Sequence, residues 1–270
     1  MPGQFQFYDD SLMSHGSMDY IMGTRFDIIS VGKSKEISES VWQNISLELI
    51  RLDKMLNCFD PNSEISHINN FAVQESVSLS NEFSEILLTC KEFHKRTLGL
   101  FDITLTDFTK IDFNYNSKSI QFQIPGLHLD LGGYAKGYAL KKINQILVKS
   151  TVNQAFINFG NSSIFGIGHH PFGHSWKISI NNPYKAGEAI DEIDLIDMSL
   201  SSSGNTPSYP KHIINPTTGK YDDSLKLVCV KAKDPVVAEV VSTSLMIANQ
   251  RERKKILRNF EVEFTQTYTF

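Results

Sequence analysis

Apolar positions recur every three or four residues in some parts of the chain and every second residue in others, which predicts both helices and strands. The helical segments also carry start and stop signals. Ser80 is a typical N-cap, and Gly99 follows the last turn of the same segment. Asp234 before Pro235 is a strong helix start. We expect helices over residues 36–56, between Ser80 and Gly99, from about 134 to 149, and from 235 to about 249.

Alternating apolar and polar residues predict strands in most of the remaining chain. Turn residues 116–118 separate two of these segments, so a hairpin is expected there. The segments predicted as strands cover residues 20–31, 111–115, 119–124, 127–131, 155–168, 176–183, 193–202, 225–233 and 261–270. Hairpins and short turns outnumber strand–helix repeats, which favours an α+β fold over a doubly wound sheet. The pattern has no internal repeat or low-complexity linker, so we expect one compact unit.

The composition of the 270-residue chain is that of an ordinary globular protein, with 41% hydrophobic and 21% charged residues. Its net charge of −4 argues against nucleic-acid binding, because no basic excess offsets phosphate repulsion. Three cysteines without a CxxC pair favour neither a disulfide scaffold nor a zinc cluster. The chain lacks the apolar run that a membrane span requires and shows no signal-peptide pattern. We therefore expect a cytoplasmic protein, or an exported one if a leader has been removed.

The stretch LHLDLGGYAKGYAL, residues 127–140, is the first candidate for chemistry. It is expected to run from a strand through Gly132 and Gly133 into a helix, with its leucines on one face and Asp130 on the other. The helix start offers free N–H groups and Lys136 adds a full positive charge, which together suit a phosphate ester. A tight turn with a solvated lysine explains the same spacing equally well. The pattern is neither a P-loop nor a dinucleotide fingerprint.

Glu239 and Thr243 form the second candidate, because they lie four residues apart in the last predicted helix and share a face. Most other positions of that helix are apolar, and a buried carboxylate is costly unless it is paired or bound to a cation. Carboxylate and hydroxyl oxygens are ligands that Mg²⁺ accepts beside substrate phosphates. Taken alone, the pair is better explained as part of an exposed polar stripe.

Two loops contribute weaker candidates. His212 lies in a short apolar run between turn clusters, where it suits an acid–base or phosphate-binding role. A lone histidine is, however, more often a structural hydrogen bonder. Phe101 and Asp102 follow a predicted helix end, where the ring could stack on a flat ligand and the carboxylate could accept its hydrogen bonds.

In their order and spacing, these segments resemble the ApbE-like FAD:protein FMN transferases. The resemblance extends from about residue 20 to the C-terminus, so we treat residues 1–19 as an N-terminal extension and residues 20–270 as the domain. It rests on the motifs MGT at 22–24, FDIT at 101–104, LDLGGYAKGYA at 129–139, SSG at 202–204, HIINPTTG at 212–219 and AEVVST at 238–243.

The resemblance implies an α+β domain built around a mainly antiparallel sheet. It also implies an enzyme that uses FAD and Mg²⁺, cleaves the pyrophosphate, passes FMN to a threonine or serine hydroxyl of an acceptor protein and releases AMP. Some similar proteins hydrolyse FAD to FMN and AMP. That activity is one alternative here, and a flavin-binding protein without turnover is another.

Carried over by position, the resemblance implies two groups of site residues. The residues that fall at FAD-binding positions are Met22, Phe59, Phe101, Asp102, Asp130, Lys136, Ser203, His212 and Ile214. The Mg²⁺ positions are the Gly133 carbonyl, the Glu239 carboxylate and the Thr243 hydroxyl. We expect catalytic roles for His212 and Asp102. The family usually has aspartate at position 239, so the longer glutamate is a departure at the metal site.

Overall fold

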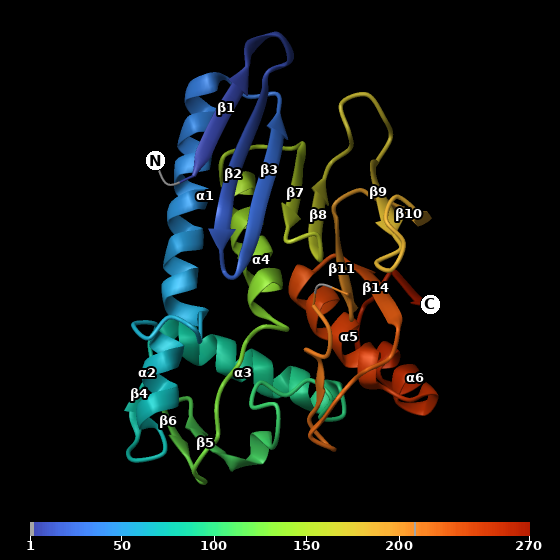
Figure 1. Ribbon diagram of the computed structural model, residues 1–270. Coiled ribbons are helices and arrows are strands. Elements are labelled where there is room, and N and C mark those ends of the chain that lie inside the picture. The colour runs from blue at the N-terminus through green and yellow to red at the C-terminus, as the bar shows by residue number, and fades with distance from the viewer. Residues whose placement is uncertain (1–2, 208) are drawn as a thin grey trace.

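One eight-stranded antiparallel sheet organises the computed structural model, which describes residues 3–207 and 209–270 (Figure 1). The strand order is β1-β2-β3-β7-β8-β11-β14-β15, and every neighbouring pair is antiparallel. This architecture confirms the α+β fold and the antiparallel sheet. The strands are β1 (Gln4–Tyr8), β2 (Met13–Ile21), β3 (Thr24–Val31), β7 (Ala155–Phe159), β8 (Ser163–Ile167), β11 (Met198–Gly204), β14 (Lys226–Ala232) and β15 (Phe264–Thr269).

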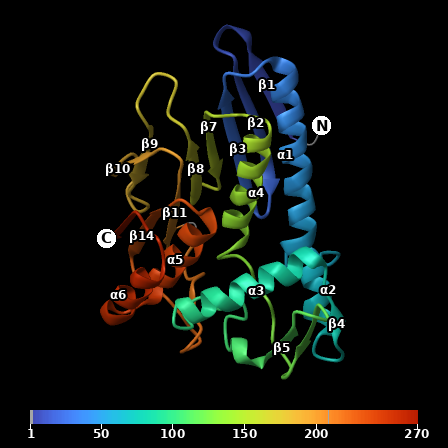
Figure 2. The same ribbon diagram turned by 180° about the vertical axis from the view of Figure 1, so that it is seen from behind.

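Three helices cover one face of this sheet, as the view from behind shows (Figure 2). They are α1 (Lys35–Leu56), α4 (Ala135–Lys149) and α5 (Pro235–Ile247). Helix α1 packs against β2 and α4, and α5 packs against α4, β11 and β14. The apolar stripe predicted for residues 36–56 lies in the core, where Ile45, Leu49 and Leu52 are fully buried. The middle helix, α4, therefore contacts a helix on each side.

The remaining elements surround this core. Helices α2 (Glu64–Phe71) and α3 (Asn81–Arg96) lie with a three-stranded sheet at the lower end in Figure 1. That sheet has the order β4 (Val77–Ser78), β6 (Ser119–Phe122) and β5 (Ile111–Asn114). The other elements are the pair β9 (Trp176–Asn181) and β10 (Ala189–Leu195), the pair β12 (Ile214–Asn215) and β13 (Lys220–Tyr221), and α6 (Gln250–Asn259). Within the described residues, no helix is long and apolar enough to cross a membrane.

The helix start and stop signals act as the sequence predicts. The Ser80 hydroxyl accepts a hydrogen bond from the Phe83 N–H at 3.2 Å and caps α3. Gly99, just beyond this helix, has a φ of +82°, which glycine adopts without strain. The Asp234 side chain accepts from the Val236 N–H at 2.9 Å and caps α5, with Pro235 in its first turn.

The prediction of one strand over residues 20–31 is wrong, because a tight turn divides the segment. Met22 and Gly23 have φ angles of +49° and +79°, so β2 ends at Ile21 and β3 begins at Thr24. The described part of the expected extension, residues 3–19, supplies β1 and most of β2. The proposed boundary at residue 20 therefore falls inside a strand of the main sheet.

Residues 127–131 are extended but do not form the predicted strand. The Leu129 N–H donates to the Asn69 side-chain oxygen at 2.7 Å, and the Asn69 amide donates back to the Leu129 carbonyl at 3.0 Å. The Asp130 N–H donates to the carbonyl of Ile103 at 2.7 Å. One asparagine and one loop carbonyl thus replace the partner strand. The alternating leucines are all buried, and an extended segment without a partner strand can bury them as well as a strand of a sheet can.

The C-terminal helical region was predicted incompletely. Helix α5 ends at Ile247 rather than near residue 249, and a separate helix, α6, follows it. The Asn249 side chain caps α6, and the Glu252 carboxylate accepts from the Asn249 N–H at 2.8 Å, which completes a capping box. Ile256 is the only fully buried side chain of α6, so its apolar periodicity is weak.

Helices α4 and α5 cross closely at Gly137. A Cβ atom added to Gly137 would lie 2.6 Å from the Pro235 carbonyl oxygen and 2.9 Å from the Val236 Cα. Both neighbours are backbone atoms, so they cannot move aside as a flexible side chain would. This close contact fixes how the start of α4 lies against the first turn of α5.

We predict that Gly137→Ala destabilises the protein by about 1–3 kcal/mol, because the methyl group overpacks a backbone contact. An alanine at an unconstrained helix position would instead add about 1 kcal/mol of stability. The matched control is Gly173→Ala, whose Cβ would meet no atom closer than 3.7 Å. Urea unfolding measures both variants, and an unchanged or higher free energy of unfolding for Gly137→Ala would contradict this packing.

Candidate functional site

A buried ion pair joins the start of α4 to the middle of α5. The Lys136 Nζ lies 2.6 Å from Oε1 of Glu239, whose side chain is only 6% exposed. The other carboxylate oxygen, Oε2, accepts hydrogen bonds from the hydroxyls of Ser163 on β8 at 2.6 Å and Ser201 on β11 at 3.1 Å. The polar face expected on α5 is therefore turned toward the protein interior, not exposed to water.

A cluster of hydroxyl oxygens extends from this carboxylate toward the turn before α4. Ser242 lies 2.9 Å from Ser201 and 2.8 Å from Ser203, and Ser203 lies 3.3 Å from the Thr243 hydroxyl. The distances are between Oγ atoms, with Oγ1 for threonine. A Cβ atom built on Gly133 would be 3.5 Å from the Thr243 Oγ1. The three predicted Mg²⁺ positions thus belong to elements that meet at this point.

The donor chemistry of these residues fits Mg²⁺. All candidate ligands are oxygen atoms, as this hard cation requires. The Glu239 carboxylate has about four acceptor positions, and Lys136, Ser163 and Ser201 occupy three of them. One position is thus left for a further ligand. The described residues contain no group of three or more His, Cys, Asp or Glu side chains that could hold a metal. A cation here would therefore depend on ligand phosphates and water for much of its coordination.

The surroundings of His212 lower the pKa of its ring. Burial lowers the pKa of His212, the hydrogen bond to the Tyr209 carbonyl raises it in part, and the positive charge of Lys136 lowers it further. The His212 Nδ1 lies 3.0 Å from that carbonyl oxygen, which can only accept, so Nδ1 carries the proton. The Nε2 atom is then the basic position of the ring.

Asp130 precedes the turn before α4, and Phe59 lies on a segment that approaches Asp130. The Asp130 carboxylate accepts from the Gly132 N–H at 2.6 Å and thereby shapes the turn before α4. Burial raises the pKa of the Cys58 thiol to about 11, and the negative charge of Asp130 adds to the rise. Phe59 follows Cys58 and is 88% exposed, an unusual position for a phenylalanine side chain.

Met22 occupies the strained turn between β2 and β3. Its N–H donates to the Asp53 carboxylate at 3.1 Å, and the Asn57 side chain donates to the same oxygen atom at 3.1 Å. The end of α1 therefore holds this turn in place. Asp53 was not found from the sequence, because a carboxylate in the last turn of a helix carries no signal of a partner in a distant turn.

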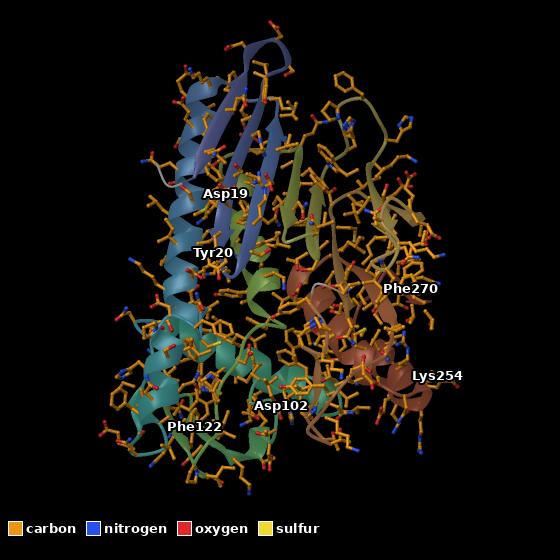
Figure 3. All side chains as sticks on the ribbon, in the orientation of Figure 1. Asp19, Tyr20, Asp102, Phe122, Lys254 and Phe270 are labelled. Carbon is orange, nitrogen blue, oxygen red and sulfur yellow. The ribbon has the colours of Figure 1, made fainter. Side chains whose placement is uncertain are left out.

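Phe101 and Asp102 are buried, and the Phe101 N–H donates to the Thr97 hydroxyl just after α3. Asp102 lies near this end of the helix (Figure 3). The Phe101 ring packs edge-on against Phe93, which makes it part of the core. The Asp102 carboxylate accepts from the N–H and hydroxyl of Thr104 at 2.8 and 2.7 Å, and from the Phe108 N–H at 3.0 Å. These bonds organise the loop over residues 102–108. The expected flavin contacts and the catalytic role of Asp102 stay predictions.

Ser203 and Ile214 lie on different segments. Ser203 belongs to the hydroxyl cluster through its contacts with Ser242 and Thr243. Ile214 pairs with Tyr221 in the short β12–β13 hairpin, whose turn is capped by the Asn215 side chain. The flavin contact expected for Ile214 stays a prediction.

Ser163 and Ser201, which donate to the Glu239 carboxylate, and Ser242, which contacts Ser201, were not predicted from the sequence, whereas Ser203 was. Ser201 and Ser203 alternate along β11, so a period of two would place them on one face of that strand. Ser242 directly precedes Thr243 on α5. Ser163 has no such signal, because every residue of β8 is buried and a serine there looks like any small core residue.

Comparisons with known proteins identify the family to which this fold belongs. The model of the ApbE family matches residues 22–118 and 104–265, so the chain belongs to the ApbE family. An FAD:protein FMN transferase of Chlamydia pneumoniae is 26% identical over 273 residues, which cover 86% of this chain and 84% of the relative. That of Haemophilus influenzae is 23% identical, covering 85% of this chain and 79% of the relative.

Solved structures give the same fold. The flavin transferase ApbE from Vibrio cholerae matches with a TM-score of 0.80 and 18% identity, over 99% of this chain and 97% of that one. The ApbE protein from Thermotoga maritima matches with a TM-score of 0.79 and 21% identity, over 98% of this chain and 97% of that one. Because the sheet and helices superpose while most side chains differ, the likeness concerns the fold.

We predict that Lys136→Met destabilises the protein by roughly 1–3 kcal/mol, because it leaves Glu239 buried with only hydroxyl partners. The matched control on the same helix is Lys141→Met. Lys141 pairs with Asp234 at 2.7 Å, but these side chains are 46% and 37% exposed, so its loss costs about 0–1 kcal/mol.

Urea unfolding compares the two lysine variants. Adding Glu239→Gln to Lys136→Met removes the unpaired charge and is expected to restore part of the lost stability. Equal destabilisation by the two lysine variants would contradict this prediction, because the Lys136–Glu239 pair would then contribute no more to the free energy of unfolding than an exposed pair.

Proposed function

We propose that this chain is an FAD:protein FMN transferase, which moves FMN from FAD to a threonine or serine hydroxyl of an acceptor protein and releases AMP, with Mg²⁺ as cofactor. The observation that carries the proposal is the Lys136–Glu239 pair. It lies beside Thr243 and Gly133, on segments within the range that the family model matches. One cation and one carboxylate, together with several hydroxyls, supply groups for both a pyrophosphate and a metal ion.

The start of α4 suits the phosphates of FAD. The first turn of a helix presents N–H groups without intrahelical partners and a partial positive charge. Lys136 adds a full charge in that turn. Asp130 shapes the preceding turn through its bond to the Gly132 N–H, and so fixes where these donors point. The exposed ring of Phe59 offers a flat surface on which an aromatic part of FAD could stack.

The reaction is a substitution at phosphorus. The acceptor hydroxyl oxygen forms a bond to the phosphorus on the FMN side, the bond from that phosphorus to the bridging oxygen breaks, and AMP leaves with the electron pair. The hydroxyl proton goes to a base, and the neutral His212 Nε2 is suited to take it. Glu239, Thr243 and the Gly133 carbonyl would hold Mg²⁺, which when bound supplies positive charge against the developing charge on the pyrophosphate.

The direct test incubates the protein with FAD, Mg²⁺ and candidate acceptor proteins. We expect AMP release together with flavin fluorescence on the acceptor that persists in a denaturing gel. Release of AMP and FMN without covalent flavin on any acceptor would instead support FAD hydrolysis. Tight FAD binding without release of AMP would support a flavin-binding protein without turnover.

The lowered pKa of His212 predicts the acid side of the pH profile. The ring must be neutral to accept a proton, and its pKa lies below the ordinary value of 6.5. The midpoint of the acid limb of kcat/KM for FAD should therefore lie below pH 6.5. His212→Ala should lower kcat about 10²- to 10⁴-fold and remove this acid limb.

The control for the pH profile is His174→Ala, because His174 lies in an exposed loop. It should keep both the rate and the acid limb of the wild type. An acid limb that persists unchanged in His212→Ala would assign the titration to another group and contradict the role of His212.

A further inference from the structure

The two oxygens of the Glu239 carboxylate have different surroundings. Oε2 faces the sheet, where it accepts from Ser163 on β8 and Ser201 on β11. Oε1 faces α4, where it contacts the Lys136 ammonium. Three elements therefore fix one side chain, and the two oxygens are divided between the sheet and the start of α4.

Ser163 is the stronger of the two serine contacts. Its Oγ lies 2.6 Å from Oε2, and the residue is 1% exposed. A carboxylate can only accept, so the single hydroxyl hydrogen of Ser163 is committed to Glu239. Ser201 is also buried, but its Oγ lies 3.1 Å from Oε2 and also contacts Ser242. A short hydrogen bond from a buried neutral donor to a charged acceptor is among the stronger side-chain contacts.

Both serines lie on adjacent strands of the main sheet, and this makes them a rigid support. Strands β8 and β11 pair in register, with Ser163 opposite Ser201. The two hydroxyls thus come from directly opposed positions and converge on one oxygen atom. A carboxylate held in this way cannot exchange its two oxygens by rotation about its last bond without losing both contacts.

We propose that Ser163, assisted by Ser201, is a positioning residue that keeps Oε2 of Glu239 on the sheet and so reserves Oε1 for a cation on the α4 side. Lys136 occupies that position in the structure described here. The inference rests on the proposed function, since the second cation is the Mg²⁺ of that proposal. Mutating a group that orients a metal ligand typically lowers metal affinity about 10- to 100-fold.

The glutamate is long enough to use this support. The backbone of Glu239 belongs to α5, which packs on the sheet, and its carboxylate reaches the Ser163 hydroxyl on β8. An aspartate at the same position is shorter by one methylene, so its carboxylate would draw back toward α5. We expect Glu239→Asp to lose the Ser163 hydrogen bond, which makes the two positions energetically coupled.

The experiment measures FAD binding by the change in flavin fluorescence at equilibrium, with Mg²⁺ titrated and no acceptor protein present. Ser163→Ala should raise the Mg²⁺ concentration at the midpoint of this titration about tenfold. Ser199→Ala is the matched control, because Ser199 is equally buried on β11 but donates to the Ile164 carbonyl at 2.9 Å. It should leave the midpoint within about twofold of the wild type.

Two further measurements separate positioning from loss of structure. Urea unfolding should show that Ser163→Ala and Ser199→Ala lose similar stability, because each removes one buried hydrogen bond. In the Glu239→Asp background, Ser163→Ala should change the Mg²⁺ midpoint by less than about twofold, because the bond it removes is already absent.

The outcomes distinguish this inference from the function on which it rests. If the wild-type protein binds no FAD, or if its FAD affinity does not change with the Mg²⁺ concentration, both the proposed metal site and this inference are wrong. A wild type that responds to Mg²⁺, together with equal midpoints for Ser163→Ala and Ser199→Ala, would overturn the inference alone. Full additivity of Ser163→Ala and Glu239→Asp would also overturn it.

Discussion

The ion pair between Lys136 and Glu239 is the contact on which the candidate site depends. A buried carboxylate is costly, and it is tolerated here because one ammonium and two hydroxyls surround it at 2.6 to 3.1 Å. The pair also requires that α4 and α5 lie very close together, and Gly137 permits that approach because it has no side chain. Packing and electrostatics are thus coupled, since the crossing that brings the two helices together also brings the two charges together.

This arrangement explains how an acidic chain can offer a site for an anion. The net charge of −4 describes the whole surface, whereas the start of α4 adds a partial positive charge at the turn where Lys136 already balances the charge of Glu239. The charge of Lys136 also lowers the pKa of His212, although burial is the larger cause. The Gly133 turn and the hydroxyl cluster of Ser203, Ser242 and Thr243 then place neutral oxygen atoms beside the charged pair. Affinity for a pyrophosphate and affinity for Mg²⁺ would therefore arise from adjacent parts of one structure.

Much of the fold could be predicted from local signals, because caps and periodicity act within a few residues. Ser80 and Asp234 start their helices as predicted, and the α+β class follows from the hairpins. The strand predicted over residues 127–131 is wrong, because alternation of apolar residues indicates which side chains are buried and not whether the backbone pairs with another strand. The Asn249–Glu252 capping box of α6 was present in the sequence, but α6 buries only Ile256, so it has no apolar periodicity that would predict a helix. In the site, the shared face of Glu239 and Thr243 was predictable, whereas Ser163 was not, because its partner is 76 residues away.

We propose that α4, α5 and the sheet form one site for FAD and a divalent cation around Glu239. A crystal of this protein grown with FAD and Mn²⁺, measured at an X-ray energy where manganese scatters anomalously, tests it most directly. We expect an anomalous peak within coordination distance of the Glu239 carboxylate and the Thr243 hydroxyl, with the FAD pyrophosphate beside Lys136. Bound FAD with the peak elsewhere, or with Lys136 and Glu239 both remote from the pyrophosphate, would contradict it.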